Sequence, residues 1–496
     1  MRHITRATLA ALAVSTCVFT VPAIAQEAIQ AGATFITAAL DPTKGSSSWA
    51  LVSHGIGEKL FMVDKDGNLV PELAATAERT GDLTWTVSLA PGRFFSDGSP
   101  VTAAALKKGF DHTFSKLPAA KSTGGMISFE AQDDLTLALT TERPVPLIAA
   151  LFAEWPLMAY TTKEDGSFLF TGPYAVEEFN VDQNLALKPN TSFPGAEDRS
   201  PINLRRFGDA QTMALAFEAG ELDIAFGLPA EGLSRLKANP GVAIKSFPVG
   251  YQYFGFINNE RPAVSDVKVR QAIDHAIDRQ ELVAAINAGT PATGAFAPYF
   301  PFAAKEPRNT DLDKAKALLD EAGWEPGSDG VREKDGHKLS ILIVTYPQRP
   351  DLVTMMPVVK AALARVGIAS DTRVVENIGE YAAGGDFDIA LWAQHTAPAG
   401  DPAYFFNSML KSDGPLNHAR YKSDAFDAII AEFSKAGTSE ERMEIALEAQ
   451  EQLFKDAPVT FLVSPSWHVG LSRRLANYEP WGSDYHVIRP KMGEVR

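Results

Sequence analysis

One stretch of the sequence, from Tyr253 to Trp324, constrains the fold of this chain more than any other. A strand-like segment, YFGFIN, leads into two short helical segments, then into the loop GTPATGAFAPYFPF, and finally into a third helical segment that ends in AGW. The first helical segment has apolar residues three and four positions apart, which predicts one buried face made of Val269, Ile273, Ala276 and Ile277. A buried strand followed by amphipathic helices is typical of a mixed α/β domain.

The ends of these helices are also marked in the sequence. We expect Ser265 to cap the first helix, and Asp278 and Glu281 to form a capping pair for the second. The third helix should begin at Asp311 and end at Gly323, a residue type that tolerates the left-handed turn found after many helices. Packing of core helices accounts for all of these positions without a binding site.

The segments follow one another in a specific order: NNERPAVSDVKVRQAIDHAIDRQELV, a Gly-Thr-Pro loop, APYFP and DLDKAKALLDEAGW. In this order they resemble the extracytoplasmic solute-binding proteins of family 5, which serve ABC importers of peptides, nickel and opine-type metal chelates. The resemblance extends over GEKLFMVDKDGNLVPELAATAE, WTVSLAPGRFFSDGSPVTA, TGPY and the late GDPAYFFNS. It implies a periplasmic binding protein fold of the class II type, in which hinge strands join two lobes around a central ligand cleft.

Short apolar strands alternate with helical segments along the chain, which by itself predicts an α/β fold with mixed sheets. At 496 residues the chain is longer than one hydrophobic core normally supports. We expect hinge crossings between Pro248 and Asn258 and between Val459 and Trp467, where the sequence is extended and rich in β-forming residues. Residues 26–248 with 465–496 would then form lobe I, including an N-terminal subdomain, and residues 249–464 would form lobe II.

Residues 1–25 have the pattern of a secretory signal peptide. Two arginines precede an apolar run from Leu9 to Val21, and Ala23-Ile24-Ala25 is a small-residue cleavage pattern. We therefore expect the mature protein in the periplasm. Cys17 is the only cysteine and lies in this segment, so the mature chain should form no disulfide and no thiolate metal site.

The charge balance and the missing motifs exclude several classes of protein. The chain has 61 acidic and 46 basic residues and a net charge of −15, which argues against nucleic acid and anionic membranes as partners. It contains no Walker A loop, H-E-x-x-H zinc motif or G-x-S-x-G elbow. We therefore expect no enzymatic activity and no intrinsic cofactor, and a secreted hydrolase is the less favoured alternative.

Two candidate ligand-binding residues lie in lobe I. His54 ends the helical segment SSSWALVSH, and the resemblance implies that this region lines the cleft, with a histidine there in some nickel-binding relatives. Neutral imidazole binds nickel, zinc and copper, so His54 could contact a metal directly; the alternative is a histidine that only packs. Trp155 is a candidate because relatives contribute cleft residues at this place, although Glu154 stands where metal-chelate binders often have arginine.

Residues 390–421, ALWAQHTAPAGDPAYFFNSMLKSDGPLNHARY, are the richest segment in candidate residues. The segment begins at the end of an apolar strand, where binding groups often collect. Aromatic side chains could wall a ligand and an arginine could bind its carboxylate; the alternatives are core packing and a surface ion pair. The position of His418 resembles that of a metal-contacting histidine in nickel-binding relatives. The candidates in this segment are Trp392, His395, Tyr404, Asn407, Asn417, His418 and Arg420.

These observations lead to one main hypothesis. The protein would be the periplasmic substrate-binding component of an ABC importer, a monomer that captures a nickel or other metal chelate, such as an opine-type metallophore, and delivers it to an inner-membrane permease. Any transition metal would belong to the transported chelate, with His54 and His418 as its protein contacts. The alternative cargo is a short peptide or another small organic solute. His468 and His486, near the C-terminus, are assigned no role.

Overall fold

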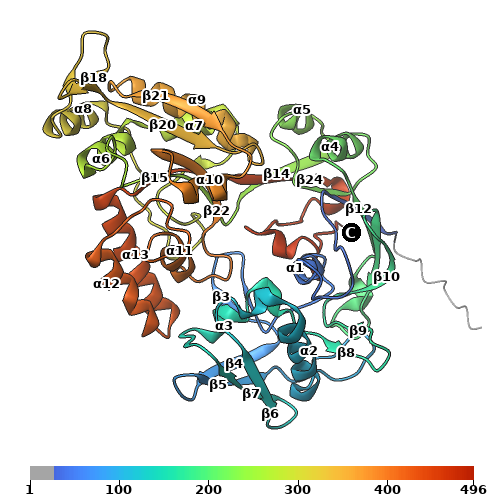
Figure 1. The fold of residues 1–496 in the computed structure, drawn as a ribbon. Coiled ribbons are helices and arrows are strands. Elements are labelled where there is room, and N and C mark those ends of the chain that lie inside the picture. Colours follow the sequence, from blue (N-terminus) through green and yellow to red (C-terminus); the bar gives the residue numbers. More distant parts are fainter. Residues whose placement is uncertain (1–26, 496) are drawn as a thin grey trace, which may run out of the picture.

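Two large mixed sheets organise the structure, one in each half of the molecule (Figure 1). The structure is a computed structural model that describes residues 27–495, so the expected signal peptide lies outside the described residues. The prediction of a mixed α/β fold is confirmed. None of the described helices is both long and apolar enough to cross a lipid bilayer.

The first sheet has seven strands, and strands from both ends of the chain meet in it. Its central strand β1 pairs in parallel with β12 and β13, whereas the late strand β24 is antiparallel to β13 and β14. Helices α1 (Ser47–Ser53), α4 (Ala210–Glu218) and α5 (Leu233–Lys237) belong to this half. The strand order is β10 (Tyr174–Asn180), β11 (Asn184–Pro189), β12 (Ile202–Arg206), β1 (Ile29–Ala33), β13 (Ile224–Phe226), β24 (Ser466–Ser472) and β14 (Val242–Pro248).

The second sheet has six strands and is buried on both faces. Successive side chains of a strand point to opposite faces, so on β15 Tyr253 and Ile257 join one apolar core, and Phe254 and Phe256 join the other. The strand order is β16 (Thr290–Pro291), β23 (Val459–Ser464), β15 (Tyr251–Ile257), β22 (Ile389–His395), β20 (Ser340–Thr345) and β21 (Ala369–Val374).

Different helices cover the two faces of this sheet. The core that contains Tyr253 is covered by α6 (Val267–Ala276), α7 (Arg279–Ile286), α8 (Leu312–Glu321) and α9 (Pro350–Ala364). The core that contains Phe254 is covered by α10 (Ile378–Gly384), α11 (Ala403–Met409), α12 (Asp424–Ala431) and α13 (Ser439–Asp456). A small sheet of β17 (Glu325–Pro326), β18 (Arg332–Lys334) and β19 (His337–Lys338) follows α8.

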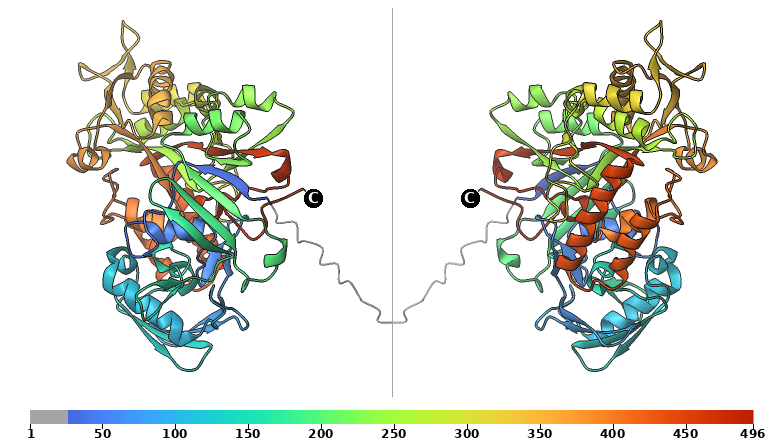
Figure 2. Two further views of the ribbon diagram at one scale, coloured as in Figure 1. Left: turned by 90° about the vertical axis from the view of Figure 1, so that its right-hand side faces the viewer. Right: turned by 90° about the vertical axis from the view of Figure 1, so that its left-hand side faces the viewer.

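A third sheet, with four strands, forms a separate layer with α2 (Ala103–Lys116) and α3 (Ile148–Leu151). It lies at the opposite end of the molecule from α6 to α9 in both side views (Figure 2). Trp85 is buried in its core. Its strand order is β4 (Ala74–Arg79), β5 (Thr84–Leu89), β7 (Thr136–Thr141) and β6 (Ile127–Ala131), and two hairpins, β2 (Phe61–Val63) with β3 (Leu69–Pro71) and β8 (Thr161–Thr162) with β9 (Phe168–Leu169), flank it.

The chain passes between the two large sheets at two neighbouring places. β14 ends at Pro248 and β15 begins at Tyr251, so Val249 and Gly250 make the first connection. Pro465 alone separates β23 from β24 and makes the second. The Val249 N–H donates to the Pro465 carbonyl at 3.2 Å, so the two connections lie side by side.

The helix ends predicted from the sequence are largely correct. Asp278 accepts hydrogen bonds from two backbone N–H groups of the first turn of α7, and Asp311 accepts from the Lys314 N–H of α8. Glu281 does not complete the predicted capping pair, because its carboxylate binds Arg365 instead. Gly323 has a φ of +82° after α8, as a left-handed turn requires. Ser265 is not the cap of α6: its hydroxyl donates to Pro262, and Asp266 accepts from the Lys268 N–H instead. A carboxylate one residue later lies closer to the free N–H groups of the first turn.

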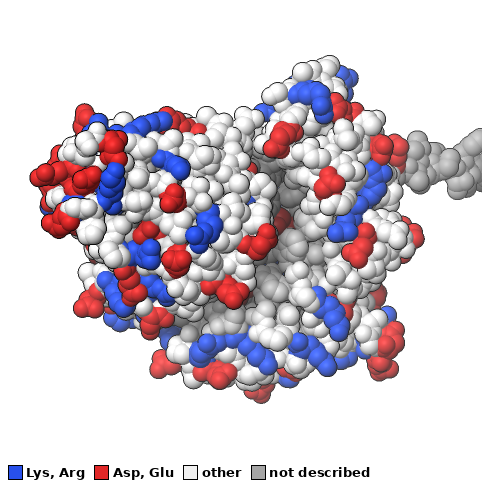
Figure 3. Space-filling model, turned by 45° about the horizontal axis from the view of Figure 1, so that its top comes forward, with Lys and Arg blue, Asp and Glu red and all other residues white. Residues whose placement is uncertain are grey.

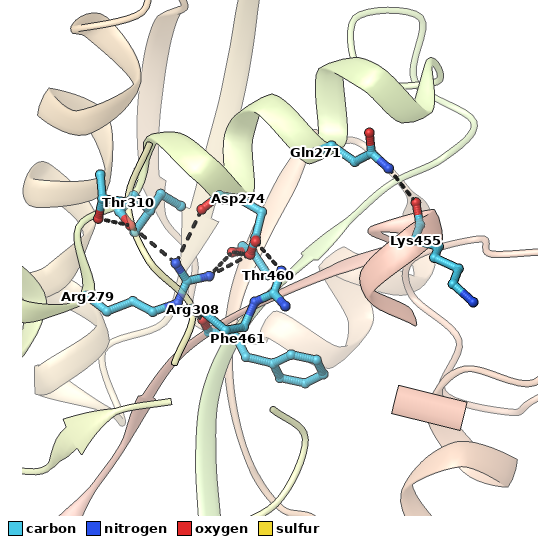
Figure 4. A network of polar contacts seen from close by, with 9 residues as sticks. Gln271, Asp274, Arg279, Arg308, Thr310, Lys455, Thr460 and Phe461 are labelled. Carbon is cyan, nitrogen blue, oxygen red and sulfur yellow. Dashed lines mark hydrogen bonds and ion pairs between the residues drawn. The ribbon is translucent and has the colours of Figure 1, made fainter. Parts of the chain in front are cut away.

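A buried ionic network ties α6 and α7 to β23 (Figure 4). Asp274 accepts hydrogen bonds from Arg279 Nη2 at 2.5 Å and from the Thr460 hydroxyl at 2.9 Å, and it also pairs with Arg308. Arg279 Nε donates to the Phe461 carbonyl at 2.7 Å. The network therefore fixes the helical layer to the strand that leads into the second connection.

Candidate ligand-binding site

A deep groove separates two parts of the molecular surface, and its visible walls are mostly uncharged (Figure 3). Between the two halves, side chains from four parts of the chain line a narrow hollow with a cavity volume of about 20 Å³. This volume is far below the roughly 300–1,000 Å³ of small-molecule binding sites, so a ligand enters only when the two halves move apart. We call this hollow the central cleft; the residues that define it here are Lys59, Tyr299, His395, Trp481, Tyr485 and His486.

The C-terminal segment forms one wall of the central cleft. It is red in Figure 1 and lies between α1 and β22. The short helix η6 (Asp484–His486) packs against α1. The Gly482 carbonyl accepts hydrogen bonds from the Gly250 N–H at 2.9 Å and from the Tyr299 hydroxyl at 3.0 Å. These bonds hold the tail across the first connection and place Tyr485 and His486 at the cleft.

His395 is the last residue of β22 and lies opposite Tyr251 at the start of β15, with ring centres 5.3 Å apart. A Cβ at Gly250 would lie 2.4 Å from His395 Nε2, so only glycine leaves room for this imidazole. His395 Nδ1 is buried and has no hydrogen-bond partner within the described part of the chain. Burial lowers the pKa of His395 to about 4, so the ring is neutral and one nitrogen can accept or bind a metal.

His486 brings a second imidazole to the same cleft. Its ring centre lies 4.6 Å from that of Trp481, at an angle of 61°. Burial lowers the pKa of His486 well below its usual value, and the charges of Lys59 and Arg489 lower it further. Both histidines are therefore neutral at pH 7 and available as metal ligands.

Lys59 supplies a cation from the half of the molecule opposite His395. Its Nζ donates to the Ala153 carbonyl at 2.5 Å and lies 5.0 Å from the centre of the Tyr485 ring. Burial lowers the pKa of Lys59 to about 8, an effect that Glu72 and Glu154 partly oppose. The ammonium group is thus mainly charged at pH 7 although the side chain is buried.

A second hollow opens beside the central cleft, between the chain around Glu154 and helix α11. Tyr404 and Asn407, two of the predicted residues, line it from α11. Burial raises the pKa of Glu154 to about 7, although Thr123 donates a hydrogen bond to its carboxylate at 2.9 Å. The predicted residue Trp155 follows directly and is half-buried in the short helix η2 (Trp155–Leu157).

A carboxylate and a guanidinium lie near η6: Asp484 within it and Arg349 beside Tyr251. Trp49 Nε1 donates to the Asp484 carboxylate at 3.3 Å, and burial raises the pKa of Asp484 to about 6. The Arg349 guanidinium lies 5.1 Å from the centre of the Tyr251 ring. A ligand that reaches these residues therefore meets both a carboxylate and a guanidinium group.

His54 does not reach the central cleft in this structure. The ring is fully buried and stacks on Phe35 with centres 5.4 Å apart, and Phe35 stacks in turn on Trp49. Neither ring nitrogen has a partner among the described residues, and burial lowers the pKa of His54 to about 3. Phe35 thus covers the His54 ring, and the expected direct metal contact from His54 stays a prediction.

Asn417, His418 and Arg420 also lie away from His395. The His418 ring packs on Phe256 and on the half-buried Trp392, with centres 5.6 and 5.1 Å apart. Phe256 is five residues along β15 from the cleft end of the strand, which is roughly 16 Å. The Asn417 amide bonds the backbone of Lys411 and Tyr421, and Arg420 donates to the Ala383 carbonyl.

In this structure His54 and His418 lie in different apolar clusters, since His54 packs on Phe35 and His418 packs on Phe256 and Trp392. Among residues 27–495, no group of three or more His, Cys, Asp or Glu side chains is arranged to hold a metal ion. Of the predicted residues, only His395 lines the central cleft, with Tyr404 and Asn407 in the adjoining hollow.

Several residues of the cleft were not predicted from the sequence. Lys59 lies in GEKLF, within a segment noted only for its family resemblance. The tail NYEPWGSDYH is unusually dense in aromatic, acidic and histidine side chains, and this density is the signal that points to Trp481, Tyr485 and His486. Tyr299, in APYFP, was likewise part of a motif without an assigned role.

Comparison with known proteins agrees with this geometry. The sequence profile of bacterial extracellular solute-binding proteins, family 5, middle region, matches residues 68–417. The chain is 24% identical to the nickel-binding protein NikA of Staphylococcus aureus, over 88% of this chain and 89% of that protein. It is 26% identical to the glutathione-binding protein GsiB of Escherichia coli K12, over 92% of this chain and 93% of that protein.

Among solved structures, the fold is similar to that of a nickel ABC transporter protein from Bacillus halodurans, with a TM-score of 0.87 and 27% identity. The match covers 94% of this chain and 99% of that one. The two-lobed architecture expected from the sequence is thereby confirmed. The chain belongs to the bacterial extracellular solute-binding proteins of family 5, the substrate-binding components of ABC importers for nickel or peptides.

Proposed function

We propose that this protein captures a nickel or similar transition-metal chelate in the periplasm and delivers it unchanged to an ABC permease. One observation carries the proposal: two neutral imidazoles, His395 from β22 and His486 from the tail, line the same small cleft. Imidazole is a ligand that nickel, zinc and copper share. The likeness to nickel-binding proteins along nearly the whole chain supports the same cargo.

The cargo would bring most of its own metal ligands. Two imidazoles leave at least two positions of a four-coordinate metal open, and more of an octahedral one. A chelator that fills those positions arrives as a preformed complex, and the protein then selects both the metal, through its histidines, and the chelator, through the rest of the cleft. The metal is in this account part of the cargo and not a cofactor of the protein.

Capture would be accompanied by closure of two lobes. We assign residues 26–248 and 465–496 to lobe I and residues 249–464 to lobe II, because the connections at Val249, Gly250 and Pro465 separate the two large sheets. Such short paired connections suit a hinge motion. Small-angle scattering should show a smaller radius of gyration after addition of a ligand that binds, and an unchanged radius would contradict closure.

Calorimetric titration with Ni(L-His)₂, the complex held by NikA of Staphylococcus aureus, tests the cargo. Replacing either cleft histidine, His395→Ala or His486→Ala, should weaken binding at least tenfold, about 1.4 kcal/mol. His337→Ala removes an exposed histidine of β19 and serves as the matched control. Equal affinities for all four proteins would remove both cleft histidines from the metal site.

A short peptide is the second candidate cargo, favoured by the charges beside η6. Arg349 could bind a peptide carboxylate and Asp484 a peptide ammonium group. The 26% identity to the glutathione-binding protein GsiB supports the same interpretation. Tighter binding of glutathione than of Ni(L-His)₂ in the same calorimeter would favour this candidate over the first.

A further inference from the structure

We propose that Lys59 is the cleft residue that binds a carboxylate of the cargo, so that the protein selects carboxylate-bearing ligands. The inference rests on the proposed function, because it concerns the chelator that accompanies the metal. Three observations carry it: the fixed position of the Lys59 backbone, the missing counter-charge at its ammonium group, and its place in the same cleft as the two histidines.

The backbone holds Lys59 rigidly in the wall of lobe I. Its N–H donates to the Glu72 carboxylate at 2.7 Å, and its carbonyl accepts from the Leu73 N–H at 3.1 Å. The preceding residue, Glu58, forms a β-bridge with Ala159. These bonds fix the backbone that carries the side chain, and the bond from Nζ to the Ala153 carbonyl orders the side chain itself, which lowers the entropy lost when a ligand binds.

The ammonium group of Lys59 lacks a counter-charge within residues 27–495. An ammonium has three N–H donors, and Nζ uses one for the Ala153 carbonyl while the Tyr485 ring lies nearby. No carboxylate forms an ion pair with it in this part of the chain. Burying a charge without an opposite one costs several kcal/mol, which a ligand carboxylate would offset.

The nearby carboxylates are engaged elsewhere. Glu58 pairs with Arg93, Glu72 accepts the backbone N–H of Lys59, and Glu154 accepts the Thr123 hydroxyl. Burial raises the pKa of Glu72 to about 8, so at pH 7 this group is mainly neutral. Against the effect of burial, the charges of Glu72 and Glu154 raise the pKa of Lys59, but neither carboxylate accepts a hydrogen bond from Nζ among the described residues.

The position of Lys59 matches the chemistry of an amino-acid chelator. Lys59, His395 and His486 line one hollow, so a metal bound by the imidazoles has the ammonium group in the wall of the same hollow. Amino-carboxylate chelators carry carboxylate oxygens close to the metal they hold. An oxygen not shared with the metal, or the second oxygen of a coordinating carboxylate, would accept from Nζ.

The test compares ligands that differ only in the carboxylate. Ni(L-His)₂ and Ni(histamine)₂ share imidazole and amine donors, and only the first has carboxylates. Wild-type protein should bind Ni(L-His)₂ at least tenfold more tightly, and Lys59→Met should abolish that preference while Lys59→Arg keeps most of it. Lys245→Met is the control, since Lys245 also donates to a backbone carbonyl, that of Tyr478, but does not line the cleft.

A second, metal-free pair separates the two proposals: alanyl-histidine and its C-terminal amide. If wild-type protein binds neither nickel complex but prefers the free peptide acid in a Lys59-dependent way, the metal cargo is refuted and the role of Lys59 stands. Two results would overturn the role of Lys59. One is that Lys59→Met loses affinity equally for both members of a pair, and the other is that the wild-type protein has no preference between them. Binding of none of the four probes overturns both proposals. Thermal unfolding followed by circular dichroism shows that each variant is folded.

Discussion

Replacing Asp274 by alanine should destabilise the six-stranded half of the molecule by about 3 to 5 kcal/mol, the usual cost of removing one partner of a buried ion pair. The substitution leaves Arg279, a nearly inaccessible guanidinium, without its carboxylate and removes the acceptor of the Thr460 hydroxyl (Figure 4). Arg279 keeps the carbonyl of Phe461 as an acceptor, which places the expected cost nearer the lower end of that range.

Urea unfolding followed by circular dichroism measures this cost from the midpoint and the slope of the transition. Asp329→Ala is the matched control, because it removes an aspartate whose partner, Lys338, is exposed, and it should leave the midpoint unchanged. A loss of less than about 1 kcal/mol in Asp274→Ala would show that the network in Figure 4 adds little to stability.

The pH dependence provides an independent check. Burial alone raises the pKa of Asp274, but the charges of Arg279 and Arg308 outweigh burial and hold this pKa below its usual range. A carboxyl group with a depressed pKa stabilises the fold above its unfolded pKa, about 3.9, and this contribution is lost as the pH falls further. The wild-type protein should therefore lose more stability below pH 4 than Asp274→Ala does.

Three further predictions concern the cleft. Gly250→Ala should lower chelate affinity at least tenfold in calorimetry, because its Cβ would lie 2.4 Å from His395 Nε2; unchanged affinity would show that this ring can move freely. His418→Ala should lower the melting temperature, since the ring packs on Phe256, but change chelate affinity less than twofold; a tenfold loss would return His418 to the site. The raised pKa of Glu154, about 7, means that the folded protein binds an extra proton between about pH 4.5 and 7, so stability falls as pH rises through this window, by roughly 3 kcal/mol at most. Glu154→Gln should flatten that slope in urea unfolding, and an unaltered slope would contradict the burial argument.

The sequence predicted best those features that depend on neighbouring residues. The buried face of α6 and the ends of α8 follow from spacing and capping within one or two turns, and both are found as expected. The crossings between sheets also lie in extended segments recognisable by their apolar strands. The cap of α6 differs by one residue because serine and aspartate are both good caps and only the structure shows which lies nearer the free N–H groups.

The binding site was predicted only in part, because it depends on contacts between distant residues. Lys59, His395 and Tyr485 are far apart in the sequence, and no periodicity relates them. His418 was chosen from its segment, but the length of β15 separates it from the cleft end of the sheet. The return of the tail to the cleft depends on two hydrogen bonds to the Gly482 carbonyl, which local sequence does not reveal.

Native mass spectrometry with elemental analysis, on protein released gently from its own periplasm, tests the central claim most directly. The proposed function predicts a bound small molecule together with one equivalent of nickel, cobalt or another transition metal, and a mass difference that identifies a carboxylate-bearing chelator. A metal-free peptide or other organic adduct would contradict the metal cargo and reduce His395 and His486 to polar residues of a nutrient-binding cleft.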